Sequence, residues 1–159
     1  MLTVHSFFDI SHNEYQDLFS PHSLVWEPLN NLKEYMDDHC GKGCKIPGSG
    51  RPLLDHIIYY NDEYIPGSAC EIKFGDTTKG GLHVMKDGIL LEGASVIMAG
   101  ATVLSKSLIL GKGVLIETGA MLKGPTILGD MTEVRQGAYL RGYCLAGKRC
   151  VLGHTTEIK

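Results

Sequence analysis

The sequence lacks the segments that would direct the chain into or across a membrane. Its longest largely apolar run, over residues 96–104, is about half of the roughly 20 residues that a membrane-spanning helix needs. At the N-terminus, Asp9 and Glu14 stand where a secretory signal would be apolar, and no basic segment precedes them. We therefore expect no membrane partner.

Cysteines and net charge are also scarce. The five cysteines are an odd set without the spacing of a disulfide framework, as is typical of a reducing compartment. The formal net charge of −3 provides no general attraction to nucleic acids or anionic lipids. Together these features favour a cytoplasmic location and no nucleic-acid partner.

Glycine, in contrast, is abundant: it accounts for 20 of the 159 residues, against a typical share of about 7%. The excess belongs to a six-residue repeat in which every sixth residue is apolar. This aliphatic column contains Met98, Leu104, Leu110, Ile116, Leu122, Leu128, Val134, Leu140, Ala146, Leu152 and Ile158. A second column, of mostly small residues, contains Thr102, Leu108, Val114, Ala120, Thr126, Thr132, Ala138, Cys144, Cys150 and Thr156. The glycines of this stretch all fall outside both columns.

This pattern predicts a short strand and a turn in every repeat. The small residue and the aliphatic residue two places later both point inward, and the glycines supply the turns. Three repeats per coil describe an all-β solenoid, the left-handed parallel β-helix, over residues 90–159. Residues 1–89 are expected to form a small mixed α/β extension or linker. It would have a helix near residues 28–39 and short strands at 57–60 and 82–85.

Residues 124–159 also resemble a known family. The motifs are R-x-G-A-x-L at 135–140 and G-H-x-x-E-I-K at 153–159. They are similar to the β-helix of sugar-phosphate nucleotidyltransferases, and most of all to the acetyltransferase half of bifunctional UDP-N-acetylglucosamine pyrophosphorylase/glucosamine-1-phosphate acetyltransferase. W-E-x-L at 26–29 resembles the connector before that β-helix. The resemblance implies a homotrimeric acyltransferase of nucleotide-sugar biosynthesis that uses acetyl-CoA.

Two departures from the family pattern limit this implication. The nucleotidyltransferase half needs a Gly-x-Gly-Thr-Arg segment with a following lysine, on a domain of roughly 200 residues. The segment 48–51, Gly-Ser-Gly-Arg, does not reproduce that motif, so we do not expect nucleotidyl transfer. The family's catalytic histidine lies beyond the Glu-Ile-Lys segment, whereas this sequence stops at Lys159. We expect a truncated repeat domain, with a naturally short protein or lost activity as alternatives.

Three basic residues, Lys123, Arg141 and Lys159, are each separated by one coil of 18 residues. Stacked about 4.8 Å apart, their charges would repel one another. A bound anion, such as a sugar phosphate or the pyrophosphate of coenzyme A, would relieve that repulsion. The family holds its substrate with an arginine and a lysine one coil apart. Arg141 and Lys159 match that spacing, whereas Arg135 matches the local motif. A solvated basic stripe is the alternative.

Other candidate residues lie at neighbouring outward positions. Glu117 and Arg135 are 18 residues apart and are predicted to form an ion pair between coils. Tyr139 would lie beneath Glu157, as a wall of the ligand site or as a trimer contact. His154, in a turn close to Glu157, is the candidate general base, with a surface or packing role as the alternative.

No metal site is predicted. His39, Cys40, Cys44 and His56 superficially resemble zinc ligands, but the spacing of the two cysteines is loose. Only two histidines follow residue 56, which is too few for the three-histidine centre of the carbonic anhydrases with this fold. Cys144 and Cys150 occupy the small inward column and are expected to pack in the core.

Two functions therefore stand as expectations. The first is a hexosamine-phosphate N-acetyltransferase-like domain of UDP-N-acetylglucosamine biosynthesis. The second is a non-catalytic trimerisation or ligand-binding β-helix that partners a separate sugar-phosphate nucleotidyltransferase. Because a solenoid that stops in mid-coil leaves strand edges open, residues 150–159 are expected to fray or to be covered by a neighbouring chain.

Overall fold

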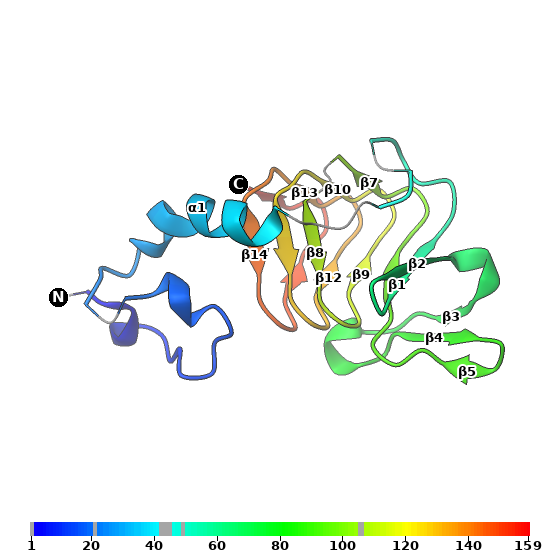
Figure 1. The fold of residues 1–159 in the computed structure, drawn as a ribbon, viewed down its shortest axis with the longest axis horizontal. Coiled ribbons are helices and arrows are strands. Elements are labelled where there is room, and N and C mark those ends of the chain that lie inside the picture. The colour runs from blue at the N-terminus through cyan, green and yellow to red at the C-terminus, as the bar shows by residue number, and fades with distance from the viewer. Residues whose placement is uncertain (1, 21, 42–45, 49, 105–106) are drawn as a thin grey trace.

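A computed structural model describes residues 2–20, 22–41, 46–48, 50–104 and 107–159. Its C-terminal part is a β-solenoid of about three turns, built from three parallel sheets (Figure 1). The first sheet contains β6 (Ser95–Ile97), β9 (Leu115–Ile116), β12 (Glu133–Val134) and β15 (Val151–Leu152). The second contains β7 (Thr102–Val103), β10 (Met121–Leu122), β13 (Tyr139–Leu140) and β16 (Glu157–Ile158). The third contains β8 (Leu108–Leu110), β11 (Thr126–Leu128) and β14 (Cys144–Ala146).

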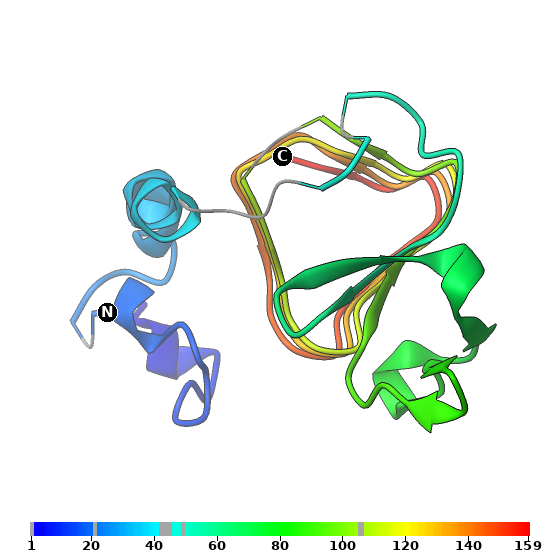
Figure 2. The same ribbon diagram turned by 45° about the vertical axis from the view of Figure 1, so that its right-hand side comes forward.

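The predicted columns form the core of the solenoid. Viewed closer to the axis, the coils superpose into one closed outline (Figure 2). The aliphatic residues from Leu110 to Ala146 are buried inside it, and so are the small residues from Val114 to Cys144. The six-residue repeat therefore identified the solenoid and its interior correctly.

In the first coil, however, the predicted frame is wrong by one residue. Ile97 and Val103 are the inward residues, and they pair with Ile116 and Leu122 of the next coil. Leu104, assigned to the core by the six-residue step, is 43% exposed. An extra residue between Val103 and Leu110 breaks the period there.

The turns explain the glycine excess. Gly119 and Gly137 occupy equivalent places in successive coils and have φ values of 75° and 72°. Glycine adopts this left-handed conformation without the steric cost that a Cβ atom brings. In the last coil the same place is taken by Thr155, with φ of 52°, so a β-branched residue holds a conformation that it rarely adopts.

Residues 46–48 and 50–66 cap the first coil. The hairpin of β1 (Ile57–Tyr60) and β2 (Glu63–Pro66) extends the first sheet, because β1 pairs antiparallel with β6. Before the hairpin, the Leu53 backbone N–H donates to the Ala101 carbonyl at 2.9 Å, beside the second sheet. Leu53 and Ile46 are buried against the core. The cap thus closes two strand edges that the solenoid would otherwise expose.

A small antiparallel sheet, separate from the three sheets of the solenoid, follows the cap. It contains β3 (Glu71–Lys73), β4 (His83–Lys86) and β5 (Ile89–Leu90). The short helix η3 (Gly67–Ala69) leads from β2 into β3, and η4 (Thr77–Lys79) lies between β3 and β4. Val84 packs with Ile58, Val96 and Leu115 over the outer face of the first sheet. Residues 89–90 therefore belong to this sheet, and the first strand of the solenoid is β6.

The N-terminal segment lies along the third sheet. After η1 (Val4–Ser6) and η2 (Gln16–Leu18), α1 (Pro28–Cys40) runs beside the solenoid (Figure 2). Its residues Met36 and Cys40 pack against Ile127. The Tyr143 hydroxyl donates to Asp37 Oδ1 at 3.0 Å, which holds the helix beside its sheet. This hydrogen bond raises the pKa of Tyr143, because it stabilises the protonated phenol.

Residues 150–159, expected to fray or to be covered, form two of the solenoid strands. β15 pairs with β12 and β16 pairs with β13, and Val151 is 46% exposed. Whether a neighbouring chain covers their free edges stays a prediction.

Candidate functional site

The outer face of the second sheet carries most of the predicted site residues. In a strand, alternate side chains point outward, so Met121, Tyr139 and Glu157 stack in register on successive strands of this face. No buried hydrophobic cluster of the described residues lies over this face, in contrast to the other two sheets. Met121 is accordingly 38% exposed.

Four of the predicted residues come together here, and we call them the Tyr139 cluster: Lys123, Tyr139, Arg141 and Glu157. Lys123 Nζ lies 5.3 Å from the centroid of the Tyr139 ring, within reach of a cation–π interaction. Arg141 Nη1 donates to Glu157 Oε1 at 3.0 Å, in an exposed salt bridge. Tyr139 does lie beside Glu157, as the coil spacing indicated.

The cluster therefore combines an aromatic ring, two cations and a carboxylate on one open face. The sequence pattern does not predict the Arg141–Glu157 pair, because the coil spacing aligns residues that are 18 positions apart. These two residues are 16 positions apart, and their long side chains meet diagonally across adjacent coils. Lys159 follows Glu157 by two residues and is exposed.

Arg135 lies elsewhere, and its predicted partner is wrong. Its Nη2 atom is 3.6 Å from Oε2 of Glu133, which lies two residues earlier, in β12 of the first sheet. Glu117 instead accepts the backbone N–H of Gln136 through Oε2 at 2.8 Å. The Glu117 carboxylate thus binds a backbone N–H group, and the Arg135 guanidinium folds back towards Glu133.

His154 occupies the exposed turn between β15 and β16. Its carbonyl oxygen accepts the Thr155 hydroxyl at 2.8 Å. Within the described part of the chain, its imidazole makes no hydrogen bond to Glu157. The catalytic role of His154 therefore stays a prediction.

The cysteines and histidines considered as zinc ligands have other contacts. His39 stacks on Tyr35, and His56 Nδ1 accepts the Ala99 N–H at 3.0 Å. Cys44 lies outside the described residues. Among those that are described, no three His, Cys, Asp or Glu side chains are grouped as metal ligands. Cys144 is buried in the core as expected, and this burial raises the pKa of its thiol.

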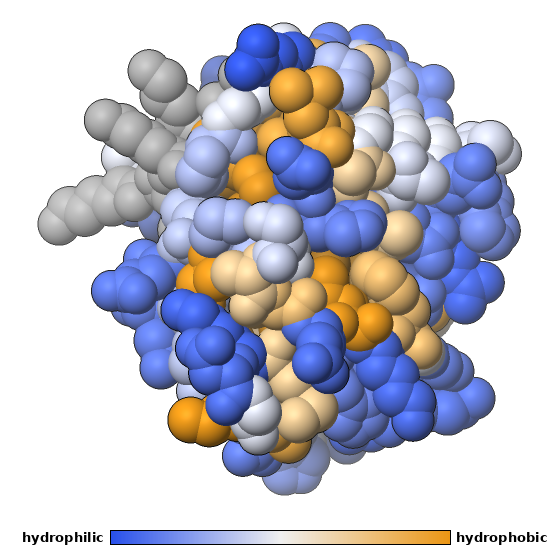
Figure 3. Space-filling model, turned by 90° about the vertical axis from the view of Figure 1, so that its right-hand side faces the viewer, coloured by the Kyte–Doolittle hydropathy of each residue, from blue (hydrophilic) through white to orange (hydrophobic). Residues whose placement is uncertain are grey.

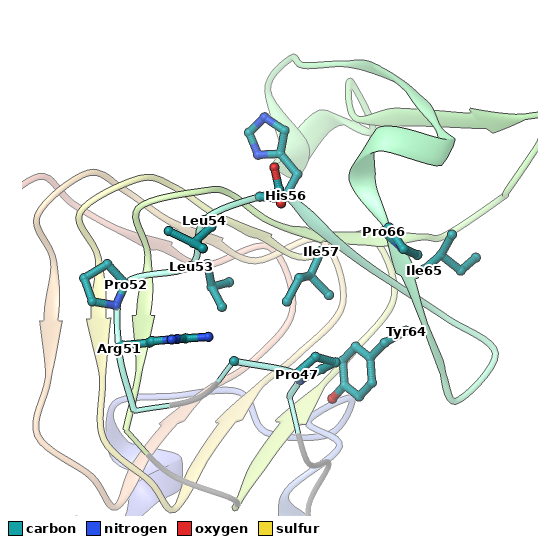
Figure 4. A pocket seen from close by; sticks show the side chains of 12 residues that line it. Pro47, Arg51, Pro52, Leu53, Leu54, His56, Ile57, Tyr64, Ile65 and Pro66 are labelled. Atoms are coloured by element: carbon teal, nitrogen blue, oxygen red, sulfur yellow. The ribbon is translucent and has the colours of Figure 1, made fainter.

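One cavity was not anticipated from the sequence. It has a volume of about 280 Å³ and lies in the cap, where apolar side chains gather among hydrophilic ones (Figure 3). Figure 4 shows Arg51 extending across it, with Leu53 and Ile57 on one side and Pro47 and Tyr64 on the other. All of its lining residues belong to the cap, between Pro47 and Pro66, and no binding motif marks this stretch of the sequence.

No helix among the described residues has the length and apolar character needed to cross a membrane. No family model matches the chain, and neither a curated protein nor a solved structure matches it. The Tyr139 cluster, defined by its own geometry, is therefore the starting point for a functional proposal.

Proposed function

We propose that the solenoid is a left-handed hexapeptide β-helix that binds a hexosamine phosphate and transfers an acyl group to it from acetyl-CoA. The observation that carries this proposal is the Tyr139 cluster on the open face of the second sheet. Its two cations suit a phosphate, and its carboxylate suits the ammonium or hydroxyl groups of an amino sugar. The biological setting would be cytoplasmic UDP-N-acetylglucosamine synthesis.

In this proposal each residue of the cluster binds a different part of the ligand. Lys123 and Arg141 would hold the phosphate, and Lys159 would add a third cation from the next coil. Tyr139 would pack against the sugar ring, since an aromatic side chain offers a broad apolar surface with a polar tip. Glu157 holds the Arg141 guanidinium at 3.0 Å; it would release it to the phosphate and turn to the ammonium or hydroxyl groups of the sugar.

In the chemical step the amine would attack the acetyl carbonyl and a base would remove its proton, while the C–S bond breaks and coenzyme A leaves as the thiol after taking up a proton. His154 is the candidate, because its turn directly precedes the strand of Glu157. Arg135 would act only indirectly, since it is engaged with Glu133 on the first sheet. A homotrimer would bring further residues to the open face.

The alternative is a non-catalytic trimerisation or ligand-binding module that works with a separate sugar-phosphate nucleotidyltransferase. One observation favours it: Arg141 is already paired with Glu157, so the face is satisfied without a substrate. The partly exposed Met121 on the same face suits contact with a second chain.

The test is acetyl-CoA turnover with glucosamine-1-phosphate, combined with calorimetric binding of the sugar phosphate. Arg141→Ala and Lys123→Ala should each lower kcat/KM about tenfold or more, because each removes a charge-assisted contact. Lys33→Ala is the matched control, since Lys33 lies 5.5 Å from the Tyr143 ring on a different face.

The outcomes separate the two functions. Turnover that falls in the cluster variants and not in Lys33→Ala supports the transferase. Binding without turnover supports the module. If the sugar phosphate neither reacts nor binds, or if all three variants behave alike, the ligand role of the cluster is wrong.

A further inference from the structure

A groove of about 500 Å³ lies over the first sheet, on a different face from the Tyr139 cluster. Phe74, which follows β3, forms one wall. Met98 and Leu115 contribute apolar surface, and Glu117, Glu133 and Gln136 contribute the polar surface. The groove thus combines an aromatic ring, an apolar floor and two carboxylates.

Glu133 is the unusual member of this set. It stands on the outer face of β12, in register with Leu115 on one side and Val151 on the other, and is only 5% exposed. A carboxylate between two apolar neighbours loses hydration and needs compensating partners.

That compensation is incomplete. Glu133 Oε2 is buried and accepts no hydrogen bond from the described residues. Arg135 Nη2 lies 3.6 Å from it, which is close enough for an ion pair but too long for a hydrogen bond. Arg135 Nε is also buried without a hydrogen-bond partner in the described part of the chain. Buried polar atoms of this kind are rare in folded proteins, and a group from outside the chain, such as a ligand or a water, would satisfy them.

The charges in the groove indicate which partner fits. Two carboxylates line it, and none of its lining residues is a lysine or an arginine. Glu117 has already used Oε2 to accept the Gln136 N–H, whereas Glu133 is engaged only by the distant guanidinium of Arg135. The Phe74 ring is 43% exposed and presents an aromatic surface that attracts cations.

We propose that this groove is a binding site for a small organic cation, an ammonium group attached to an apolar or aromatic body. The ammonium donates to Glu133 and lies near Glu117 and the Phe74 ring. The apolar body rests on Met98 and Leu115. This site does not depend on the function proposed for the Tyr139 cluster, because the two share no residue.

The test is a titration of the complete, 15N-labelled chain with benzylammonium, followed by NMR. The amide signals of Gly75, Glu117 and Gln136 should shift and saturate. Glu133→Gln should weaken binding about tenfold, because it removes a charged hydrogen bond and keeps the shape of the side chain. Phe74→Leu, at a partly exposed position, should weaken it severalfold without unfolding the chain. Glu71→Gln, at an exposed carboxylate on β3, is the matched control and should bind as the wild type does.

Benzyl alcohol, which has nearly the same shape and no charge, distinguishes a cation site from a merely apolar groove. The proposal predicts that it causes no saturating shifts at the concentrations at which benzylammonium binds. The proposal is overturned if benzylammonium does not bind, if benzyl alcohol binds as well, or if Glu133→Gln and Phe74→Leu both retain wild-type affinity. In the last case an ordered water satisfies Glu133.

Discussion

Ile57 of the cap pairs antiparallel with Ile97, the inward residue of the first coil. On its other side Ile97 pairs in parallel with Ile116. The first sheet therefore continues without interruption from the solenoid into the hairpin, and the cap is part of the same hydrogen-bonded structure. Loss of the cap should weaken the solenoid itself.

The residue next to Ile57 provides the test of this coupling. Ile58 is fully buried where the first sheet packs against the small sheet of β3, β4 and β5. Ile58→Ala should lower the free energy of unfolding by about 2–5 kcal/mol, since it leaves a cavity in a closely packed cluster. Urea unfolding monitored by circular dichroism would measure the change.

Leu54→Ala, at a side chain that is 82% exposed, should change stability by less than about 0.5 kcal/mol. Equal effects of the two substitutions would show that the cap does not contribute to the folded core.

The turns predict effects of opposite sign at equivalent positions. Gly119→Ala should destabilise the chain by about 1–2 kcal/mol, because φ of 75° places the new Cβ in a left-handed conformation. Thr155→Gly, two coils further on, should be neutral or stabilising, because it removes a β-branched side chain from the same conformation. Thermal unfolding of both variants would measure this difference. If both substitutions lower the melting temperature equally, backbone conformation does not control these turns.

The physical regularity of the coils explains why the solenoid could be predicted. Each coil buries the same small and aliphatic positions, so aliphatic residues that recur 18 positions apart identify the core directly. The prediction is wrong by one residue in the first coil, because an extra residue between Val103 and Leu110 shifts the period there. Val103 is then buried and Leu104 exposed, while the apolar pattern of the sequence is almost unchanged. The sequence also indicates that the outer face of the third sheet is covered. Apolar residues recur there at outward positions 18 residues apart, and α1 packs on them: Ile109, Ile127 and Leu145.

The sites were less predictable, because they depend on side-chain direction as well as register. The coil spacing indicated that Tyr139 and Glu157 are neighbours. It did not indicate that Arg141 would reach diagonally to Glu157, or that Arg135 would turn back to Glu133. The groove under Phe74 needs segments that lie far apart in the sequence, and the cavity at Arg51 needs the folded cap, so neither has a local motif.

Asp76 gives a prediction on pH. Its Oδ1 atom accepts the Thr78 hydroxyl at 2.6 Å, and this hydrogen bond, with Lys79 as a second partner at 2.9 Å, lowers the pKa of Asp76 to about 2. Because the pKa is lower in the folded state, the stabilising contribution is complete above the usual value of 3.8 and is lost as pH falls towards 2. A 13C NMR titration of the carboxyl group should find the low pKa in the wild type and a higher one in Thr78→Val. An unchanged pKa in Thr78→Val would mean that the hydroxyl is not its main cause.

The salt bridge inside the Tyr139 cluster can be removed by one substitution, whose expected effect rests on the function proposed for that cluster. Glu157→Gln removes the carboxylate that competes with an incoming anion for Arg141. Stability should change by less than about 1 kcal/mol, because an exposed ion pair contributes little. Affinity for inorganic phosphate should rise severalfold, since the guanidinium is released and the local negative charge is lower. Isothermal titration calorimetry with phosphate would measure this gain, with Glu71→Gln as a control for the loss of one negative charge elsewhere. Lower affinity in Glu157→Gln would instead show that Glu157 positions Arg141 for the anion, and equal affinity in both variants would exclude Arg141 from the site.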